Sequence, residues 1–346
     1  MNETKKTAVV AMSGGVDSSV TALLLQQQGY NVIGLTGKMI ESNVPDNAKR
    51  VADKLGIELY VFDAVEKFNE KVINYFVEDY KNGRTPNPCI MCNQFIKWGA
   101  LFDYAVDVLG ADVFATGHYA DVRCVDGVYK LYPAKDEHKD QLYFLYRLGQ
   151  KQLSKTIFPL YHYEKAQVKQ MAVDYDLPPK DSKESQDICF IQKPVTTKSF
   201  LTDKFGTKKG DFIDVLTGKK WGEHDGAYKF TVGQRRGIGI AAPYPLYVID
   251  VDPVKNIVYV GREEDNYKKV VKISNLNLTY TPAVTEMDAW VKIRYNMPHK
   301  KAHVRLYEDF ADIEFDEPVN SVTRGQSGVI YDLSDKHLIG GGIINF

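Results

Sequence analysis

The segment Ser13–Ser19, with the sequence Ser-Gly-Gly-Val-Asp-Ser-Ser, combines residue types that bind phosphate groups. Its two glycines let the backbone approach a ligand, and the helix expected to follow points its first N–H groups at an anion. The serine hydroxyls add donors, whereas Asp17 would repel a bare anion unless Mg²⁺ bridges it to the phosphates. The alternative is an ordinary Gly-Gly turn that caps a helix. The full heptapeptide favours a pyrophosphate site.

Two other nucleotide-binding motifs are absent from the sequence. There is no Gly-x-x-x-x-Gly-Lys-Ser/Thr run, which excludes a P-loop kinase or GTPase. No Gly-x-Gly-x-x-Gly follows the first expected strand, which argues against a dinucleotide-dependent oxidoreductase. The heptapeptide resembles the pyrophosphate loop of the ATP pyrophosphatases, which adenylate a carbonyl oxygen and release pyrophosphate.

Cys89 and Cys92 form a Cys-x-x-Cys pair within Gly83–Asn93. We expect the two prolines of this segment to prevent a helix and to shape a loop that leads into a helix near Gln94. A cysteine at that helix N-terminus would have a lowered pKa and raised reactivity, and Lys97 adds positive charge nearby. The pair alone is compatible with a redox, a zinc or an iron–sulfur site.

The other two cysteines carry weaker signals. Cys189 lies in Glu184–Ile191, where a polar run turns apolar, a setting typical of a buried core cysteine. Cys124 lies in the hairpin-like segment Tyr119–Lys130 and receives no role, because free cysteines are among the most buried residue types.

Strands and helices alternate in the first half of the chain, which predicts βαβ units and a doubly wound parallel sheet. The expected strands are Thr7–Met12, Asn31–Leu35, Ile57–Phe62 and Asp112–Thr116, and the expected helices are Ser18–Gln28, Asp46–Leu55, Glu66–Lys81 and Ile96–Leu109.

From about Gly210 the chain has short alternating segments separated by turn signals, which predicts small β-barrels or sandwiches. The expected strands are Tyr247–Val251, Ile257–Val260, Trp290–Arg294 and Ala302–Tyr307. We therefore expect an α/β catalytic domain over residues 1–200, a small central β domain over 201–268 and a C-terminal β-barrel domain over 269–346.

Composition bounds the class of protein. The 346 residues are 44% hydrophobic and 26% charged, as in soluble multidomain proteins. No apolar run reaches the roughly 18 residues that span a bilayer, and the polar start at Met1–Thr7 predicts no signal peptide. Four cysteines are too few for a disulfide scaffold and indicate a reducing, cytosolic compartment.

Taken in order, segments along nearly the whole chain resemble the tRNA-specific 2-thiouridylase family of the ATP pyrophosphatase superfamily. In the first half these are Ser13–Ser19, Gly83–Asn93, Ala115–Tyr119, Lys139–Leu145 and Glu184–Ile191. In the second half they are Thr231–Gly239, Gly325–Gly328 and Gly340–Ile343. The fold implied is a PP-loop domain like the adenine nucleotide alpha hydrolases, followed by two small β domains.

The resemblance implies ATP-dependent insertion of sulfur at C2 of the wobble uridine of tRNA. ATP and Mg²⁺ would activate the C2 oxygen as an adenylate, sulfur would attack C2, and AMP would leave. Cys189 matches the family's persulfide carrier and Cys92 its partner nucleophile, which cleaves the persulfide by thiol–disulfide exchange and leaves a disulfide bond. The implied partners are the tRNAs for Lys, Glu and Gln and an upstream persulfide donor or sulfur-relay protein, in the cytoplasm and without a membrane.

The resemblance also implies the site residues. The catalytic residues are Cys92, Cys189 and Asp17. The ATP-binding residues are Ala11, Met12, Ser13, Gly14, Gly15, Val16, Asp17, Ser18, Gly37 and Gly117. The tRNA-binding residues are Asn87, Pro88, Cys89, His118, Lys139, Asp140, Gln141, Arg294, Tyr295 and Gln326.

Two departures from the family matter. The better-known members carry Asp where this chain has Cys89. Together with Cys92 and Cys189 it could hold three irons of a [4Fe–4S] cluster and leave the fourth open for exogenous sulfide, which makes a cluster mechanism a rival to the persulfide route. The stretch after Leu35 is shorter than in the family, which leaves the adenine contacts there open.

The segment Lys292–Arg305 holds five lysines and arginines, two histidines and no acid. Lys292 and Arg294 alternate with apolar residues and should share one face of a strand, with Tyr295 available to stack on a base. Since Glu308–Glu317 is acidic, we expect a polarised charge despite the net charge of −1. The pattern predicts a nucleic-acid surface, and a solvated strand face is the alternative.

Two rival functions are weighed against 2-thiolation. Another PP-loop ATP-dependent synthetase, acting on a small metabolite, would need neither Cys92 nor Cys189. A non-catalytic RNA-binding or iron–sulfur module would not need the intact Ser13–Ser19 loop.

Overall fold

A five-stranded parallel sheet, in the order β3-β2-β1-β4-β7, organises the first half of the chain. The computed structural model describes residues 5–41, 46–180 and 188–345. The strands of this sheet are β1 (Thr7–Ala11), β2 (Asn31–Lys38), β3 (Glu58–Asp63), β4 (Val113–Thr116) and β7 (Thr156–Ile157). The expected parallel sheet is confirmed.

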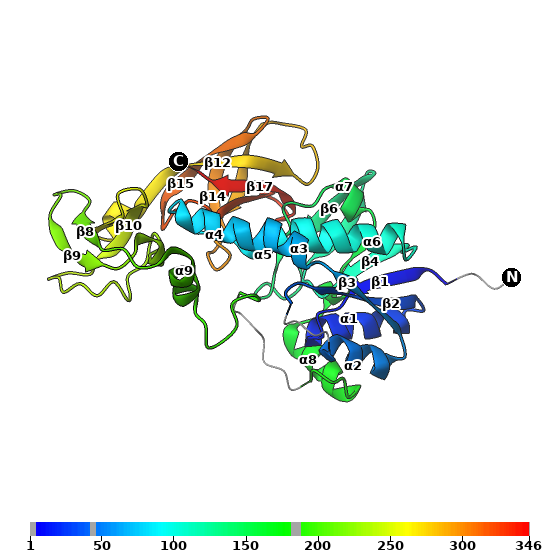
Figure 1. Cartoon of the computed structure of the whole chain (residues 1–346). Coiled ribbons are helices and arrows are strands. Elements are labelled where there is room, and N and C mark those ends of the chain that lie inside the picture. The colour runs from blue at the N-terminus through cyan, green and yellow to red at the C-terminus, as the bar shows by residue number, and fades with distance from the viewer. Residues whose placement is uncertain (1–4, 42–45, 181–187, 346) are drawn as a thin grey trace.

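Helices cover both faces of the sheet (Figure 1). Successive side chains of β1 point to opposite faces, so they pack alternately in two hydrophobic cores, one on each side of the sheet. Val9 packs in one core with Phe102, whereas Val10 packs in the other with Leu25. The helices are α1 (Val16–Gln27), α2 (Asp46–Leu55), α3 (Val65–Phe68), α4 (Asn74–Lys81), α5 (Pro88–Met91), α6 (Phe102–Asp107), α7 (Gln150–Leu153), α8 (Lys165–Asp174) and α9 (Thr197–Phe205). Within the described ranges, every helix is too short or too polar to cross a lipid bilayer.

Two π-helical segments join shorter α-helices into long ones. The segment η1 (Asn69–Ile73) connects α3 with α4, and η2 (Cys92–Leu101) connects α5 with α6. Short 3₁₀ turns are η3 (Leu142–Phe144), η4 (Pro159–His162), η5 (Ala227–Lys229) and η6 (Glu264–Asn266).

The prediction of a loop up to Gln94 is wrong, because the helix begins at Pro88. Proline lacks an N–H, but at the first helical position that N–H would have no intrahelical partner, so proline costs nothing there. Asn87 completes the start by accepting a hydrogen bond from the Cys89 N–H at 3.2 Å. The two prolines therefore set the start of the helix and do not delay it.

Two small β structures follow. The central one is a four-stranded sheet in the order β10-β11-β8-β9. Its strands are β8 (Gly210–Asp214), β9 (Lys220–His224), β10 (Tyr247–Asp252) and β11 (Ile257–Gly261). The C-terminal strands are β12 (Tyr267–Leu278), β13 (Glu286–Lys292), β14 (Lys300–Leu306), β15 (Phe310–Asn320), β16 (Ser327–Tyr331) and β17 (Leu338–Ile344). They close into a barrel because β12 pairs with both β15 and β17.

A hairpin from the first half of the chain extends the barrel sheet. Its strands β5 (Asp121–Val125) and β6 (Val128–Tyr132) follow β4 in sequence, and Leu131 of β6 lies in register with Leu338 of β17. Barrel residues such as Tyr331 and Leu338 share a core with Phe102 of the catalytic half. The hairpin predicted around Cys124 is confirmed, but its place in the barrel sheet was not predicted.

Candidate active site

The phosphate loop lies between the end of β1 and the start of α1, with no side chain among the described residues capping the helix. Gly14 has φ of +77°, and a Cβ there would lie 2.6 Å from the Ala48 backbone nitrogen, so only glycine fits. The hydroxyls of Ser18 and Ser19 donate to the Gly15 carbonyl oxygen at 3.1 and 2.8 Å. In this structure the two serines therefore hold the turn, and their role as donors to phosphate stays a prediction.

Asp17 is engaged by residues from two distant elements. Both carboxylate oxygens lie 2.6 Å from Nζ of Lys165, at the start of α8, and the Tyr119 hydroxyl donates to Oδ1 at 3.0 Å. The Lys165 side chain is only 9% exposed, so the ion pair is largely shielded from water. Lys165 therefore balances the negative charge of Asp17 at the loop.

A cavity of about 450 Å³ joins the phosphate loop to the cysteines, and we call it the cysteine cavity. Ala11, Met12, Ser13 and Gly37 line one part, and Pro88, Cys89, Cys92, Lys97 and Cys189 line another. Cys189 lies just after residues 181–187, which fall outside the described ranges together with much of the matched segment Glu184–Ile191. The expectation that three cysteines meet at one site is confirmed.

The predicted lowering of the cysteine pKa values is wrong. Cys92 lies one helical turn inside the helix that begins at Pro88, and burial raises its pKa to about 12. Cys89 and Cys189 are partly open to solvent, but desolvation by the surrounding cavity walls still raises the pKa of both thiols, and the Lys97 ammonium acts in the opposite direction on all three. All four cysteines of the chain lie in the described ranges and are free thiols. In this state the thiols are protonated and poorly reactive.

The π-helix η2 places Lys97 on the side of the helix that carries Cys92. Hydrogen bonds in a π-helix link residues five apart, so Cys92 and Lys97 are about one turn apart, and both line the cavity. Lys97 Nζ also lies 3.4 Å from Nε2 of His118, whose Nδ1 is 2.7 Å from the Thr116 hydroxyl. Burial and the nearby Lys97 hold the pKa of His118 well below its usual value, so the imidazole is neutral.

Gly117 and Gln141 fix the turn that faces Asp17. A Cβ at Gly117 would lie 2.8 Å from the Ser18 backbone nitrogen, which is too close for any side chain. The turn after β4 can therefore pack this closely against the start of α1 only because residue 117 is glycine. Gln141 accepts the Tyr119 N–H with its side chain at 3.1 Å and donates its own N–H to the Tyr119 carbonyl at 3.0 Å.

The remaining predicted tRNA-contact residues are divided between the catalytic half and the barrel. Burial raises the pKa of Asp140 to about 6, opposed by Lys292 and by backbone N–H groups. Lys139 precedes it in the turn before η3, where its N–H donates to the Asp136 carbonyl at 3.0 Å. Tyr295 packs against Phe144 with the ring centroids 4.5 Å apart, so its ring is held by protein contacts.

Arg294 faces the interior and not a strand surface. Strand β13 ends at Lys292, and the Arg294 guanidinium donates to the Val232 carbonyl at 2.7 Å and to the Thr323 hydroxyl. The expectation that Lys292 and Arg294 share one strand face is therefore wrong. Arg294 instead connects the barrel to the central β structure.

The segment Gly83–Asn87, which we call the junction segment, contacts all three parts of the molecule. The Thr85 N–H donates to the Arg324 carbonyl, and Gln326 Nε2 donates to the Thr85 carbonyl, both at 2.8 Å. The Thr85 hydroxyl lies 3.4 Å from that of Thr231 in the central part. The position of the helix that carries Cys89 and Cys92 thus depends on both β structures.

The predicted polarised charge on the barrel is also wrong. His303 on β14 lies 2.7 Å from Glu286 on β13, and Arg305 lies 2.9 Å from the same carboxylate. Lys301 pairs with Asp288 on β13 and with Asp316 on β15. Acids of the neighbouring strands pair with three of the four basic residues of β14, and within the described ranges only Lys300 of this strand has no such partner.

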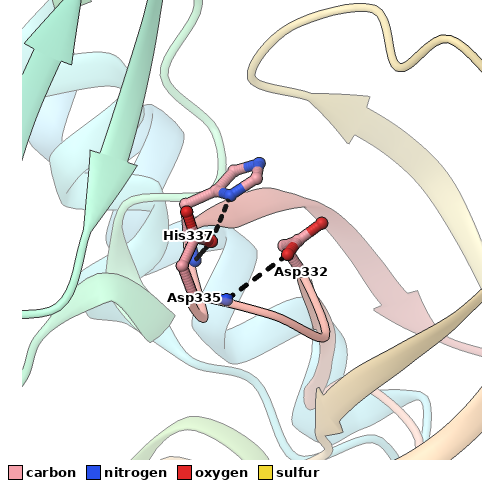
Figure 2. A group of neighbouring side chains, drawn as sticks. All are labelled: Asp332, Asp335 and His337. Atoms are coloured by element: carbon pink, nitrogen blue, oxygen red, sulfur yellow. Dashed lines mark hydrogen bonds and ion pairs between the residues drawn. The ribbon is translucent and has the colours of Figure 1, made fainter. Parts of the chain in front are cut away.

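A cluster of Asp332, Asp335 and His337 forms the turn between β16 and β17 (Figure 2). Their ligand atoms lie within 4.8 Å of one another, the only such group among the described residues. However, His337 Nδ1 is 2.6 Å from Asp335 and Nε2 is 2.7 Å from the Tyr280 hydroxyl, so both ring nitrogens already have partners. Asp332 accepts N–H bonds from its own turn, and the cluster is a turn-stabilising network.

Three domain descriptions match the chain. Residues 6–193 match a tRNA methyl transferase HUP domain, residues 198–262 a tRNA methyl transferase PRC-barrel domain, and residues 268–344 an aminomethyltransferase beta-barrel domain. The tRNA-specific 2-thiouridylase MnmA of Carboxydothermus hydrogenoformans is 42% identical over 98% of each chain. That of Halothermothrix orenii is 43% identical over 97% of this chain and 98% of the relative. Among solved structures, the U34-tRNA thiolase NcsA from Methanococcus maripaludis with its [4Fe-4S] cluster aligns with 58% of this chain and 64% of its own, at 18% identity and a TM-score of 0.37.

Proposed function

The chain belongs to the tRNA-specific 2-thiouridylase family, and on that premise we propose that it catalyses ATP-dependent 2-thiolation of the wobble uridine of tRNA. The observation that carries the proposal is the cysteine cavity, in which Met12 and Ser13 of the phosphate loop and the thiols of Cys92 and Cys189 line one space. Activation by ATP and delivery of sulfur can then act on one base without its release.

The first step is adenylation. The C2 oxygen of the uridine attacks the α-phosphorus of ATP, an O–P bond forms, and the α–β bond breaks so that pyrophosphate leaves with the electron pair. The N–H groups at the start of α1 suit the leaving pyrophosphate. Mg²⁺ would shield the phosphate charge, but Asp17 is paired with Lys165, so the loop does not offer a free carboxylate for the ion.

The second step transfers sulfur. The terminal sulfur of a persulfide on Cys189 attacks C2, a C–S bond forms, and AMP leaves with the C2 oxygen. The Cys92 thiolate then attacks Cys189 Sγ and breaks the S–S bond, which produces 2-thiouridine and a Cys92–Cys189 disulfide. A thiol reductant restores both thiols, and an upstream persulfide donor reloads Cys189.

The site residues and the division of the chain remain proposals. We assign ATP binding to Ala11–Ser18, Gly37 and Gly117, and tRNA contact to the residues inferred from the family. We place the catalytic domain at residues 1–200, the central domain at 201–268 and the barrel at 269–346. The expected acceptors are the tRNAs for Lys, Glu and Gln, and the free thiols suit a reducing cytoplasm.

The proposal is tested by incubating the enzyme with ATP, unmodified tRNA and a persulfide source. We expect AMP, pyrophosphate and 2-thiouridine in equal amounts, with 2-thiouridine measured by mass spectrometry of tRNA nucleosides. A tRNA whose wobble uridine is replaced by cytidine serves as the control. AMP release on a small metabolite in place of tRNA would contradict the proposal and favour a different synthetase.

A cluster variant of the same reaction is favoured by one observation, namely that Cys89 lines the cavity with Cys92 and Cys189. Three thiolates suit three irons of a [4Fe–4S] cluster, so these residues fit the group. A cluster held there would offer its open iron to sulfide, while the chain's own residues would still bind ATP and tRNA.

Anaerobic purification separates the two routes. The persulfide route predicts an iron-free enzyme. It also predicts that the Cys89→Asp variant keeps its thiolation activity within about threefold of the wild type, because Cys89 has no covalent role in that route. Iron, acid-labile sulfide and 2-thiouridine are measured on both proteins, with Cys124→Asp as the control at an exposed cysteine. About four irons per chain in the wild type, lost together with activity in Cys89→Asp, would contradict the persulfide route.

A further inference from the structure

Two exposed arginines lie in Thr231–Gly239, which we call the arginine loop. Within the described part of the chain, neither Arg235 nor Arg236 has an ion pair, a hydrogen bond from its guanidinium or a ring contact. By contrast, Lys301, His303 and Arg305 of β14 are paired with acids of the neighbouring strands. The arginine loop therefore holds positive charge that nothing in the described structure neutralises.

The backbone of the arginine loop is held in place. Gln234 accepts the Thr231 N–H at 3.2 Å and donates to the Arg236 carbonyl at 2.9 Å, so its side chain spans the loop. The Gln234 carbonyl accepts the Val248 N–H at 2.9 Å, and Gly233 N–H donates to the Val248 carbonyl at 2.8 Å. The two arginines thus project from a fixed turn, which lowers the entropy cost of binding.

The base of the arginine loop is tied to the active site. The Thr231 hydroxyl contacts Thr85 in the junction segment, four residues before Cys89, and the Val232 carbonyl accepts from Arg294 of the barrel. A polymer bound by the loop would therefore be placed at a defined position relative to the cysteine cavity.

A groove of about 820 Å³ continues from the arginine loop, and its lining includes Gly237, Lys198 and Lys209. His224 also lines it, is 8% exposed, and has no hydrogen-bond partner for Nε2 among the described residues. The two acids of the groove are already paired, Glu223 with a lysine at 3.0 Å and Asp225 with another at 2.6 Å. The unbalanced charge of the groove has the same sign as that of the loop.

We propose that the arginine loop and the adjoining groove bind the phosphate backbone of tRNA and position its anticodon arm over the cysteine cavity. This proposal rests on the proposed function. Guanidinium groups bind phosphate oxygens with two parallel hydrogen bonds, and the groove supplies ammonium groups and a buried N–H donor along the same path. The loop thereby adds positive charge that no acid neutralises, whereas most of the positive charge of β14 is paired.

The test compares the full-length wild type with R235Q/R236Q. We expect tRNA affinity near 0.1 M salt to fall on the order of tenfold. The slope of the logarithm of the binding constant against the logarithm of the salt concentration should become shallower by about 1.4–1.8, since each phosphate contact contributes roughly 0.7–0.9. The KM for tRNA should rise while kcat at saturating tRNA stays within about twofold. R262Q is the matched control, because Arg262 is an exposed arginine of the same part that already pairs with Glu264.

Several outcomes would overturn the proposal. If R235Q/R236Q binds tRNA with unchanged affinity and salt dependence while the wild type is active, the tRNA-binding role of the arginine loop is refuted and the proposed function is not. An equal loss in R262Q would show a general charge effect. Normal tRNA binding with a defect only when sulfur comes from a donor protein would assign the loop to that protein. A wild type that neither binds nor thiolates tRNA would refute the proposed function as well.

Discussion

Cys189→Ser and Cys92→Ser should each reduce formation of 2-thiouridine by at least about 10³-fold, because serine can neither carry a persulfide nor reduce one. Both side chains line the cysteine cavity, and serine fits in place of cysteine, so the fold should not change. Adenylation needs neither thiol. Release of pyrophosphate in the presence of tRNA should therefore continue in both variants while 2-thiouridine disappears.

Cys124→Ser is the matched control, because Cys124 lies on the exposed hairpin and outside the cavity. It should leave both pyrophosphate release and thiolation unchanged. Either active-site variant that still makes 2-thiouridine at more than about a tenth of the wild-type rate would refute the role of that cysteine. Loss of pyrophosphate release together with thiolation would mean that the thiol is also needed for binding ATP or tRNA.

Asp17→Asn should lower AMP formation by at least about a hundredfold while tRNA binding is retained. The carboxylate lies at the first turn of α1, where it holds Lys165 and Tyr119 around the phosphate loop. Removing the charge leaves the Lys165 ammonium without its partner in a largely buried position, which costs about 3–5 kcal/mol of stability. AMP is measured by chromatography, and unfolding by thermal melting.

The double variant Asp17→Asn with Lys165→Met separates stability from catalysis. It removes both charges, so the melting temperature should recover toward that of the wild type. If Asp17 acts in adenylation, AMP formation should stay low in the double variant. Recovery of AMP formation along with stability would instead show that the ion pair serves the fold alone.

The sequence predicted the parallel sheet well because each buried strand is a short apolar run followed by a helix with clear stop residues. The sequence places the start of the helix that carries Cys89 and Cys92 too late, because a proline usually breaks a helix, whereas Pro88 occupies the first helical position, where proline is favourable. The lowered cysteine pKa values failed for the same reason. Cys92 is inside the helix, and burial outweighs the charge of Lys97.

Other features depend on pairings between distant residues, and no local pattern reveals them. Lys165 reaches Asp17 from an element far along the chain, and nothing in the neighbourhood of Lys165 marks it. The basic run of β14 likewise does not reveal the acids that oppose it on β13 and β15, because these strands pair with β14 only in the fold. For Arg235 and Arg236 a local signal did exist, since the pair lies between Gln234 and Gly237 in a segment that matches the family.

The hairpin β5–β6 gives the protein a constraint in time. Its strand β6 pairs with the edge of β17, where Leu131 lies in register with Leu338. This pairing can form only after β17 has been synthesised. That strand leaves the ribosome roughly 200 residues later, which at 5–20 residues per second takes about 10–40 s. Until then the core around Phe102 lacks Tyr331 and Leu338, so the catalytic half completes its packing only after β17 has been synthesised.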